Sequence, residues 1–285
     1  MANLKELRNR IASVSSTMQI TSAMKMVAAA KLKKAQDAIT QMRPYAQKLE
    51  EILVNVSSTL DASENEYARE ADKTERILLV AISSNRGLCG AFNANIVKKV
   101  QAYIKESPAT VDVICIGRKG MEIMTKRGVN VVKDYNDFYS NPHFEEAKSI
   151  AENLMQLFID GQYQRVELVY NRFVNAATQR SQVEQYLPVR QPEANSEAAG
   201  DYIYEPGKME ILEDLIPRSL KTQLFKALLD SLASEHGARM TAMHQATDNA
   251  QDLKRDLSLD YNKARQAAIT NEILEITAGA NALNG

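Results

Sequence analysis

Hydrophobic positions at the start of the chain follow a helical period over a long stretch. Alternating steps of three and four from Leu4 reach apolar side chains almost without exception as far as Leu60, and only Thr21 and Lys25 are polar. A seam held over about eight repeats is typical of a coiled-coil strand. The first 86 residues contain no glycine and one proline, Pro44, so a very long helix is permitted.

The C-terminal part shows a second helical pattern. Residues 218–278 contain no proline and one glycine, Gly237. Small side chains on one stripe allow another helix to approach closely, and two long helices that leave one domain bury their seams most simply against each other, antiparallel. The stripe consists of Ala238, Ala242, Ala246 and Ala250, and continues through Leu253, Leu257, Tyr261, Ala264 and Ala268.

Between the two helices the hydrophobic period changes to that of a mixed α/β domain. The expected elements are strands at 76–82, 111–116, 129–133, 166–170 and 183–187, and helices at 91–106, 119–127 and 144–160. The first strands alternate with helices and indicate βαβ units, whereas the last two alternate apolar and polar residues and indicate an antiparallel extension at one edge.

These patterns predict an α/β protein in which a long antiparallel coiled coil of the N- and C-terminal helices accompanies a central Rossmann-like domain. The predicted division is 1–75 for the N-terminal coiled-coil helix, 76–207 for the α/β domain and 208–285 for the C-terminal coiled-coil helix. The acidic stretch 61–75 and residues 191–207 have the composition of linkers.

Charge and composition narrow the function. Lys and Arg number 35 against 36 acidic residues, which gives no reason to expect a nucleic acid or an anionic membrane surface as partner. No apolar run approaches the ~18 residues that a membrane span requires. The first 34 residues are nevertheless basic, with seven Lys or Arg and a single Glu. This end of the chain is expected to seek an acidic partner surface.

The segment that most resembles an enzyme site is the loop Ser83–Gly90, between the first strand and a helix. Backbone N–H groups in that position favour anions, and Arg86 could assist. The loop lacks both the GxGxxG spacing and the GK[ST] ending of nucleotide sites, so a structural turn built on Arg86, Gly87 and Gly90 is the preferred interpretation.

Other candidate chemistry is sparse. Cys89 could act as a nucleophile but has no histidine in a triad pattern. Two of the three histidines, His236 and His244, are eight residues apart on the C-terminal helix without metal-site spacing, and are expected on the helix surface. We therefore expect no catalytic residue, no cofactor and no metal.

Methionines in the long helices offer an adaptable apolar surface. Lys25 interrupts the seam between Met24 and Met26, which suggests that this stretch faces a partner as well as its paired helix.

Three segments together resemble the gamma subunit of rotary F-type ATP synthases, and the resemblance spans the whole chain. They are the runs at 20–31 (ITSAMKMVAAAK), 86–93 (RGLCGAFN) and 269–280 (ITNEILEITAGA), and Ser234-Glu235 and 239–243 (RMTAM) add to them. The family usually has an aspartate where this chain has Asn85.

The resemblance implies a non-catalytic rotor shaft in the central stalk. Such a shaft transmits rotation between a proton-driven c ring and the hexamer of alpha and beta subunits, where beta carries the ATP chemistry, and its α/β part rests with the epsilon subunit on the c ring. The implied location is the cytoplasmic face of a bacterial plasma membrane, with peripheral attachment through the complex. The residues expected to contact the stator are Met24, Lys25, Lys31, Lys33, Lys34, Arg239, Thr270, Glu272 and Glu275.

Two other interpretations remain open from the residues alone. One is a coiled-coil adaptor with a Rossmann-like head, and the other is a small-molecule enzyme that uses the loop from Arg86 to Gly90. An adaptor would bind partners without altering their turnover, whereas an enzyme would lose its own activity on Cys89→Ala or Arg86→Ala.

Overall fold

The computed structural model describes residues 4–57, 66–69, 74–136, 143–189 and 208–283. Leu60 and most of the two expected linkers lie outside these ranges, as do the side chains of Leu53 and Val56. The elements, in chain order, are α1 (Leu4–Ser57), η2 (Glu66–Ala68), β1 (Arg76–Ile82), α2 (Phe92–Glu106), β2 (Thr110–Ile116), α3 (Arg118–Lys126), β3 (Val131–Asp134), α4 (Phe144–Ile159), β4 (Arg165–Phe173), β5 (Gln179–Leu187) and α5 (Lys208–Leu283).

The strands form one sheet in the order β3-β2-β1-β4-β5. The pairs β3–β2, β2–β1 and β1–β4 are parallel, and β5 joins β4 antiparallel at the edge. The predicted βαβ units and antiparallel edge extension are therefore confirmed. Strands β4 and β5 are longer than predicted, because their ends toward the connecting turn consist mostly of polar residues without the apolar alternation on which the prediction rested.

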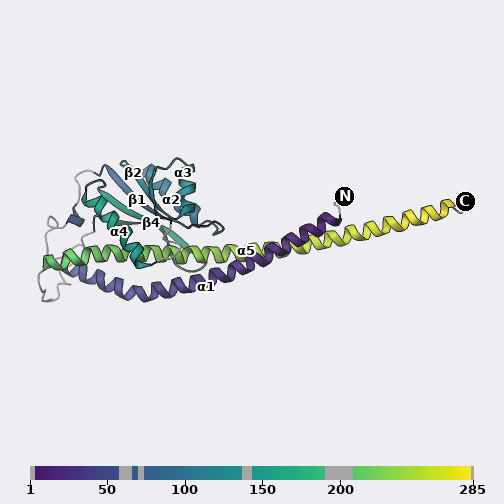
Figure 1. Cartoon of the computed structure of the whole chain (residues 1–285), viewed down its shortest axis with the longest axis horizontal. Coiled ribbons are helices and arrows are strands. Elements are labelled where there is room, and N and C mark those ends of the chain that lie inside the picture. Colours follow the sequence, from purple (N-terminus) through teal and green to yellow (C-terminus); the bar gives the residue numbers. More distant parts are fainter. Residues whose placement is uncertain (1–3, 58–65, 70–73, 137–142, 190–207, 284–285) are drawn as a thin grey trace. The chain divides into compact units, whose positions relative to one another are not determined.

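Two apolar clusters cover the two faces of the sheet, as Figure 1 shows for α2 and α3 on one side and α4 on the other. Successive residues of β1 alternate between them: Leu78 and Val80 join the cluster of α4 and α5, whereas Leu79 and Ala81 join that of α2 and α3. A strand buried on both faces has to be apolar throughout, which explains the uninterrupted run in β1.

Val129 does not begin β3 as predicted, because it completes the end of α3. Gly128 has a φ of 75°, and its N–H bonds the carbonyl of Thr125 at 3.1 Å. The N–H of Val129 reaches back to the carbonyl of Met124 at 3.1 Å. This pair of bonds is a Schellman motif, in which a left-handed glycine satisfies the last carbonyls of a helix.

The chain divides into two compact units, one of residues 1–27 with 240–285 and a second of residues 28–239. Each unit contains a part of α1 and a part of α5. This division cuts both long helices, and the three-part division expected from sequence stays a prediction.

In the first unit the two helices pair antiparallel. Arg8 Nη2 donates to the hydroxyl of Tyr261 at 3.0 Å, and the two hydroxyls of Thr21 and Thr247 lie 2.8 Å apart. The residue numbers of the contacting positions thus decrease along α5 as they increase along α1, as expected for antiparallel helices. The polar interruption at Thr21 is buried but satisfied across the seam, and Lys25 is half-buried.

The seam on α5 follows a different register from the predicted one at one point. Leu253 is 50% exposed, whereas Lys254 is half-buried and its Nζ donates to Ser15 Oγ at 3.3 Å. A step of four from Ala250, rather than three, keeps the stripe on the face toward α1. The apolar character of Leu253 misled the prediction, because the stem of a lysine fills a seam position while its amine reaches the edge.

In the second unit α5 continues the same antiparallel arrangement and also covers the sheet. Most of the predicted seam residues of α1 in this unit are buried, namely Ala28, Leu32, Ala35, Ile39 and Leu49, whereas Met42 and Ala46 are half-buried. On α5, Leu220, Leu224 and Leu228 belong to the cluster on the sheet. The predicted fold class, an α/β domain with long paired terminal helices, is confirmed.

A buried carboxylate ties the start of β1 to the start of β2. Asp112 accepts from Arg76 Nη2 at 2.7 Å, from Asn130 Nδ2 at 2.7 Å and from the Tyr163 hydroxyl at 3.0 Å. The guanidinium of Arg76 also stacks 5.0 Å from the ring centre of Tyr163. Burial alone would raise the pKa of Asp112, but these hydrogen bonds outweigh it and lower the pKa below the usual 3.8.

Asp112→Asn is expected to destabilise the fold by about 1–3 kcal/mol near neutral pH, because a buried charged acceptor of three hydrogen bonds is lost. A depressed folded-state pKa means that the stabilisation is present above the unfolded pKa and is lost as pH falls through the folded pKa. Urea unfolding near neutral pH and again below about pH 4 should show the difference between variant and parent narrowing in acid.

Glu106→Gln is the control for this measurement, since Glu106 is exposed at the end of α2. Equal stability of Asp112→Asn and the parent near neutral pH would contradict the role given to the cluster.

Candidate functional site

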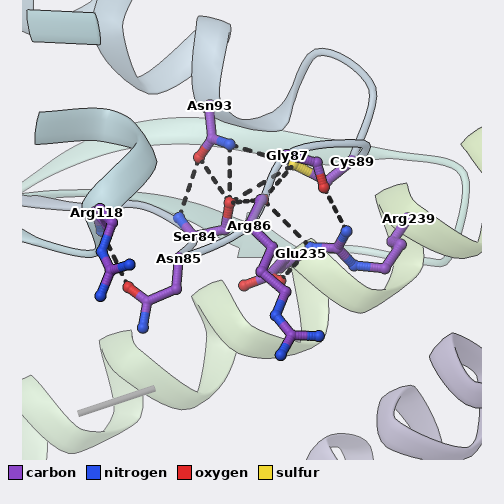
Figure 2. Close-up of polar contacts among 9 residues, drawn as sticks. All are labelled: Ser84, Asn85, Arg86, Gly87, Cys89, Asn93, Arg118, Glu235 and Arg239. Atoms are coloured by element: carbon purple, nitrogen blue, oxygen red, sulfur yellow. Dashed lines mark hydrogen bonds and ion pairs between the residues drawn. The ribbon is translucent and has the colours of Figure 1, made fainter. Parts of the chain in front are cut away.

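The carboxyl ends of β1 and β4 form the place where folds of this kind bind ligands. The chain runs from β1 to β2 on one side and then crosses to β4 on the other, so the sheet has its topological switch point between β1 and β4. The loop expected to be a structural turn, with Arg86, Gly87 and Gly90, lies at this edge. Figure 2 shows this loop beside α5.

The backbone donors at the start of α3 are occupied by the β1 loop. Arg118 N–H donates to Asn85 Oδ1 at 3.0 Å, and Lys119 N–H donates to the Ser84 carbonyl at 2.9 Å. Gly120 N–H donates to Ser83 Oγ at 3.1 Å. The N–H groups that would hold a phosphate at this helix start therefore already have partners.

Asn85 uses both ends of its side-chain amide. Its oxygen accepts from Arg118, and its Nδ2 donates to the Asn136 carbonyl at 2.7 Å. An aspartate could supply only the first of these bonds, because an ionised carboxylate has no donor.

Glycine is required where the two loops meet. Gly117 has a φ of 113°, and a Cβ there would lie 2.1 Å from the Ser83 carbonyl oxygen. At Gly120 a Cβ would lie 2.3 Å from Ser83 Oγ. The close approach of β1 and α3 depends on these two residues, since any side chain would collide with Ser83.

The start of α2 is organised by Asn93, whose side chain is buried. Its Oδ1 accepts from Ser84 N–H at 3.0 Å, and its Nδ2 donates to Ser84 Oγ at 2.8 Å and lies 3.3 Å from Cys89 Sγ. Cys89 is 2% exposed, and burial raises the pKa of its thiol against smaller opposing effects from Ser84 and Arg239. A buried thiol held in its protonated form is a poor nucleophile.

The turn itself bends in the left-handed region at two residues. Leu88 has a φ of 61° and Gly90 a φ of 58°. Gly90 adopts this conformation without strain, whereas Leu88 does so at a cost.

The C-terminal helix fills the crevice at the switch point. Ser234 Oγ donates to the Asn171 carbonyl at 2.8 Å, and Asn171 Nδ2 in turn donates to the Phe92 carbonyl at 3.2 Å. Gly237 allows the β4–β5 turn to approach, since a Cβ there would lie 3.2 Å from the Ala176 carbonyl oxygen. The end of β4 and the turn after it are thus packed on α5 where a ligand would otherwise enter.

Arg239 joins α5 to the loop. Its guanidinium donates through Nη1 to the Gly87 carbonyl, through Nη2 to the Arg86 carbonyl at 3.4 Å, and to Glu235 Oε1 at 2.6 Å. Both side chains of the ion pair are largely buried. Burial raises the pKa of Glu235, and Arg239, with smaller contributions from Lys31 and Arg86, opposes that rise.

His236 is buried, contrary to the expectation that it lies on the helix surface. It packs within the second unit, where burial, with smaller effects from Lys31 and Arg239, lowers its pKa to about 4. It is therefore a neutral side chain near neutral pH. His244 is exposed, as expected.

Within the described ranges, no three His, Cys, Asp or Glu side chains gather closely enough to hold a metal ion. None of the described helices has a stretch long and apolar enough to cross a bilayer.

The residues expected to contact a stator are not gathered at one site. Arg239 is in the loop contact just described, and Lys31 exerts its charge on Glu235 and His236. Of the other residues in this set, Met24 and Lys25 are half-buried. The remaining five are exposed, namely Lys33, Lys34, Thr270, Glu272 and Glu275.

Sequence reasoning did not find the partners of Arg239. Glu235 and Ser234 appeared only as part of a resemblance, and Asn93 and Asn171 were not singled out. A buried Asn has no sequence signal of its own, but the spacing of Glu235 and Arg239 is that of an ion pair one helical turn apart.

Fold and site together define a class of protein: an α/β domain whose ligand crevice is closed by its own C-terminal helix, with both terminal helices paired antiparallel. The family model described as ATP synthase matches residues 3–283. The ATP synthase gamma chain of Christiangramia forsetii is 58% identical, with 100% of both chains covered. The chain belongs to the ATP synthase gamma-chain family.

Solved structures agree. The rotor of the Euglena gracilis mitochondrial ATP synthase contains a chain that is 25% identical at a TM-score of 0.69, with 93% of this chain and 98% of that chain covered. The central stalk and c ring structure of the Tetrahymena thermophila enzyme contains one that is 25% identical at a TM-score of 0.57, with 80% and 99% covered.

Arg239→Ala is expected to destabilise the second unit by about 3–5 kcal/mol, because it leaves Glu235 as an uncompensated buried carboxylate. Without its partner the folded-state pKa of Glu235 rises further above the unfolded value, so the folded form binds a proton more tightly. The variant should therefore regain stability as pH falls from neutral through that pKa, in urea unfolding followed over pH.

The matched control is the double variant Glu235→Gln/Arg239→Met, which removes both charges. It should be more stable than Arg239→Ala near neutral pH and should lack the gain in acid. If Arg239→Ala shows the same pH dependence as this control, the buried ion pair does not have the role assigned to it.

Proposed function

We propose that this chain is the rotating central shaft of an F-type ATP synthase and transmits rotation between a proton-driven c ring and a catalytic hexamer of alpha and beta subunits. The observation that carries the proposal is the antiparallel pairing of α1 and α5, which each unit shows with buried seam positions. A continuous packed seam without glycine hinges in α1 suits an element that must resist twisting.

The chain itself is proposed to be non-catalytic. Support comes from the loop after β1, where Asn85, Ser83 and the Ser84 carbonyl accept from the N–H groups at the start of α3 and Cys89 is buried as a thiol. ATP chemistry then belongs to the beta subunits.

Its proposed partners are the alpha and beta subunits, epsilon and the c ring. The solved relatives are described as a rotor and as a central stalk with c ring, and this supports the transfer. The proposed location is the cytoplasmic face of the bacterial plasma membrane, with attachment through the complex.

We place the contacts with the stator on two stretches of helix. The first is the basic part of α1 with Met24, Lys25, Lys31, Lys33 and Lys34, whose charge suits acidic loops of beta.

The second stretch is the end of α5, with Thr270, Glu272 and Glu275. In the first unit this end extends past the first described turn of α1, and Ile273 and Ile276 are 55% and 71% exposed there. An exposed apolar helix end of this kind fits a bearing that surrounds it.

Reconstitution tests the proposal directly. The purified chain is mixed with separately purified alpha and beta subunits, and complex formation and ATP turnover are recorded. A single stable assembly whose multisite turnover requires this chain is the expected result. Binding without any effect on turnover would favour a coiled-coil adaptor, and ATP hydrolysis by the chain alone, abolished by Arg86→Ala, would refute its non-catalytic status.

Met24→Lys is expected to lower the coupling of proton transport to ATP synthesis, because it adds a charge beside Lys25 on a surface that must slide past its neighbours. In membrane vesicles with the assembled enzyme, proton pumping per ATP hydrolysed should fall roughly twofold or more while hydrolysis continues. Met24→Leu keeps an apolar side chain of similar volume and should leave coupling unchanged. Equal coupling in both variants would argue against a bearing at this stretch.

A further inference from the structure

A pocket of about 270 Å³ opens between α1, α5 and β4 within the second unit. Three apolar side chains form its floor, buried Ile39 and Leu229 and half-buried Met42, and the buried carboxylate of Asp230 lines the pocket beside them. Two cations, Arg172 of β4 and Lys226 of α5, line it together with Ala46, Gln47 and Asp230. An apolar floor beneath two cations is suited to a ligand with both an apolar and an anionic part.

A third cation stands beside the pocket. Arg180 of β5 pairs directly with Arg172 of β4, so both side chains emerge on the same face of the sheet. Like charges in directly opposed positions of an antiparallel pair repel and destabilise the strands. This repulsion lowers the stability of the sheet edge when no ligand is bound, and a bound anion would reduce it.

Two carboxylates of this region, Glu184 and Asp230, have contacts of their own. Glu184 is held by Tyr170 and by Gln223 Nε2, the latter at 2.8 Å. Asp230 is buried and has an interaction of its own. In the described part of the chain no ion pair involves Arg172, Arg180 or Lys226.

Size and spacing decide the kind of ligand. The pocket is smaller than the ~300–1,000 Å³ typical of sites that enclose a whole small molecule. The three cations are spread over two strands and a helix, so they match several carboxylates along a segment better than one compact anion. An apolar floor of this size has room for a side chain that projects from such a segment.

We propose that Arg172, Arg180 and Lys226, with the floor formed by Ile39, Met42 and Leu229, form a docking site for an acidic segment of a partner protein. The segment places carboxylates against the three cations and one apolar side chain on the floor. The identity of the partner as another subunit of the same assembly rests on the function proposed above. The chemistry of the docking site is independent of that function.

Binding is tested with the full chain and a synthetic peptide that alternates pairs of glutamates with single leucines. Isothermal titration at low salt should show saturable binding that weakens as salt is added. Inorganic phosphate and vesicles of phosphatidylglycerol are the two other probes. Binding of phosphate or vesicles with the same dependence on Arg172 and Arg180, and no binding of the peptide, would overturn the proposal.

Charge reversal locates the site. Arg172→Glu/Arg180→Glu should weaken binding of the peptide by about tenfold or more, since two attractions become repulsions. The matched control is Lys98→Glu/Lys99→Glu, two exposed lysines of α2 on the other side of the sheet, which should bind as the parent does. Equal loss in both double variants, or loss in neither, would refute a specific site.

The single variant Arg172→Glu separates binding from folding. It replaces the repulsive cross-strand pair by an attractive one with Arg180, so its melting temperature should rise slightly while its affinity for the peptide falls. A residue that only supports the fold could not produce this opposite response. A lower melting temperature together with unchanged affinity would overturn the assignment.

In the assembled complex, a photo-crosslinking residue in place of Arg172 should capture an acidic segment of another subunit, identified by mass spectrometry. If the complex assembles with chain-dependent turnover but the crosslink joins no acidic segment, the docking-site proposal is refuted and the proposed shaft function is supported. If the peptide binds as expected but the chain does not assemble with alpha and beta, the proposed shaft function is refuted and the docking-site proposal is supported.

Discussion

The structure depends on the burial of α5 on two sides at once between Leu212 and Arg239. Leu224 and Leu228 pack on the sheet, while the facing part of α1 is buried by the same helix. A helix covered on both sides is normally apolar all round, yet this one includes Ser231, Ser234 and Glu235 among its buried residues. Small side chains allow close approach, and the charged one is paired, which is the condition under which a buried carboxylate is tolerated.

The same constraint explains why the switch point of this sheet is filled from within the chain. In doubly wound folds the switch point is concave because loops after the strands diverge. Here Ser234 and Arg239 reach into that place from α5 and bind backbone carbonyls of Asn171, Arg86 and Gly87. These bonds connect the loop after β1, the end of β4 and the long helix, so movement of α5 in this region is resisted by the strands themselves.

Much of the helix pairing could be predicted from the sequence, because it depends on a hydrophobic period that is maintained over many residues. The seam from Leu7 to Leu49 was readable because its positions face the paired helix, where an unpartnered polar side chain would be buried at a cost. Two smaller errors of the sequence prediction have local causes. Val129 belongs to the helix cap at Gly128 and not to β3. Lys254 takes the seam position predicted for Leu253, because the aliphatic stem of a lysine can pack in a seam. The contact of Arg239 with Gly87 spans 152 residues, and no local pattern encodes which carbonyl a buried arginine will find.

Rigidity and adaptability are thus assigned to different parts of the chain. Polar contacts with fixed geometry hold α5 to the sheet, where any slippage would leave Glu235 buried without a partner. In the first unit the seam includes small or flexible side chains such as Ala250 and Met243, and the buried Thr21 is satisfied by Thr247. Apolar contacts of that kind are non-directional and lose little when a neighbour changes. The shaft function proposed above requires a firm hold at the α/β domain and tolerance of varying surfaces along the helices, and the buried ion pair and the methionines suit these two requirements.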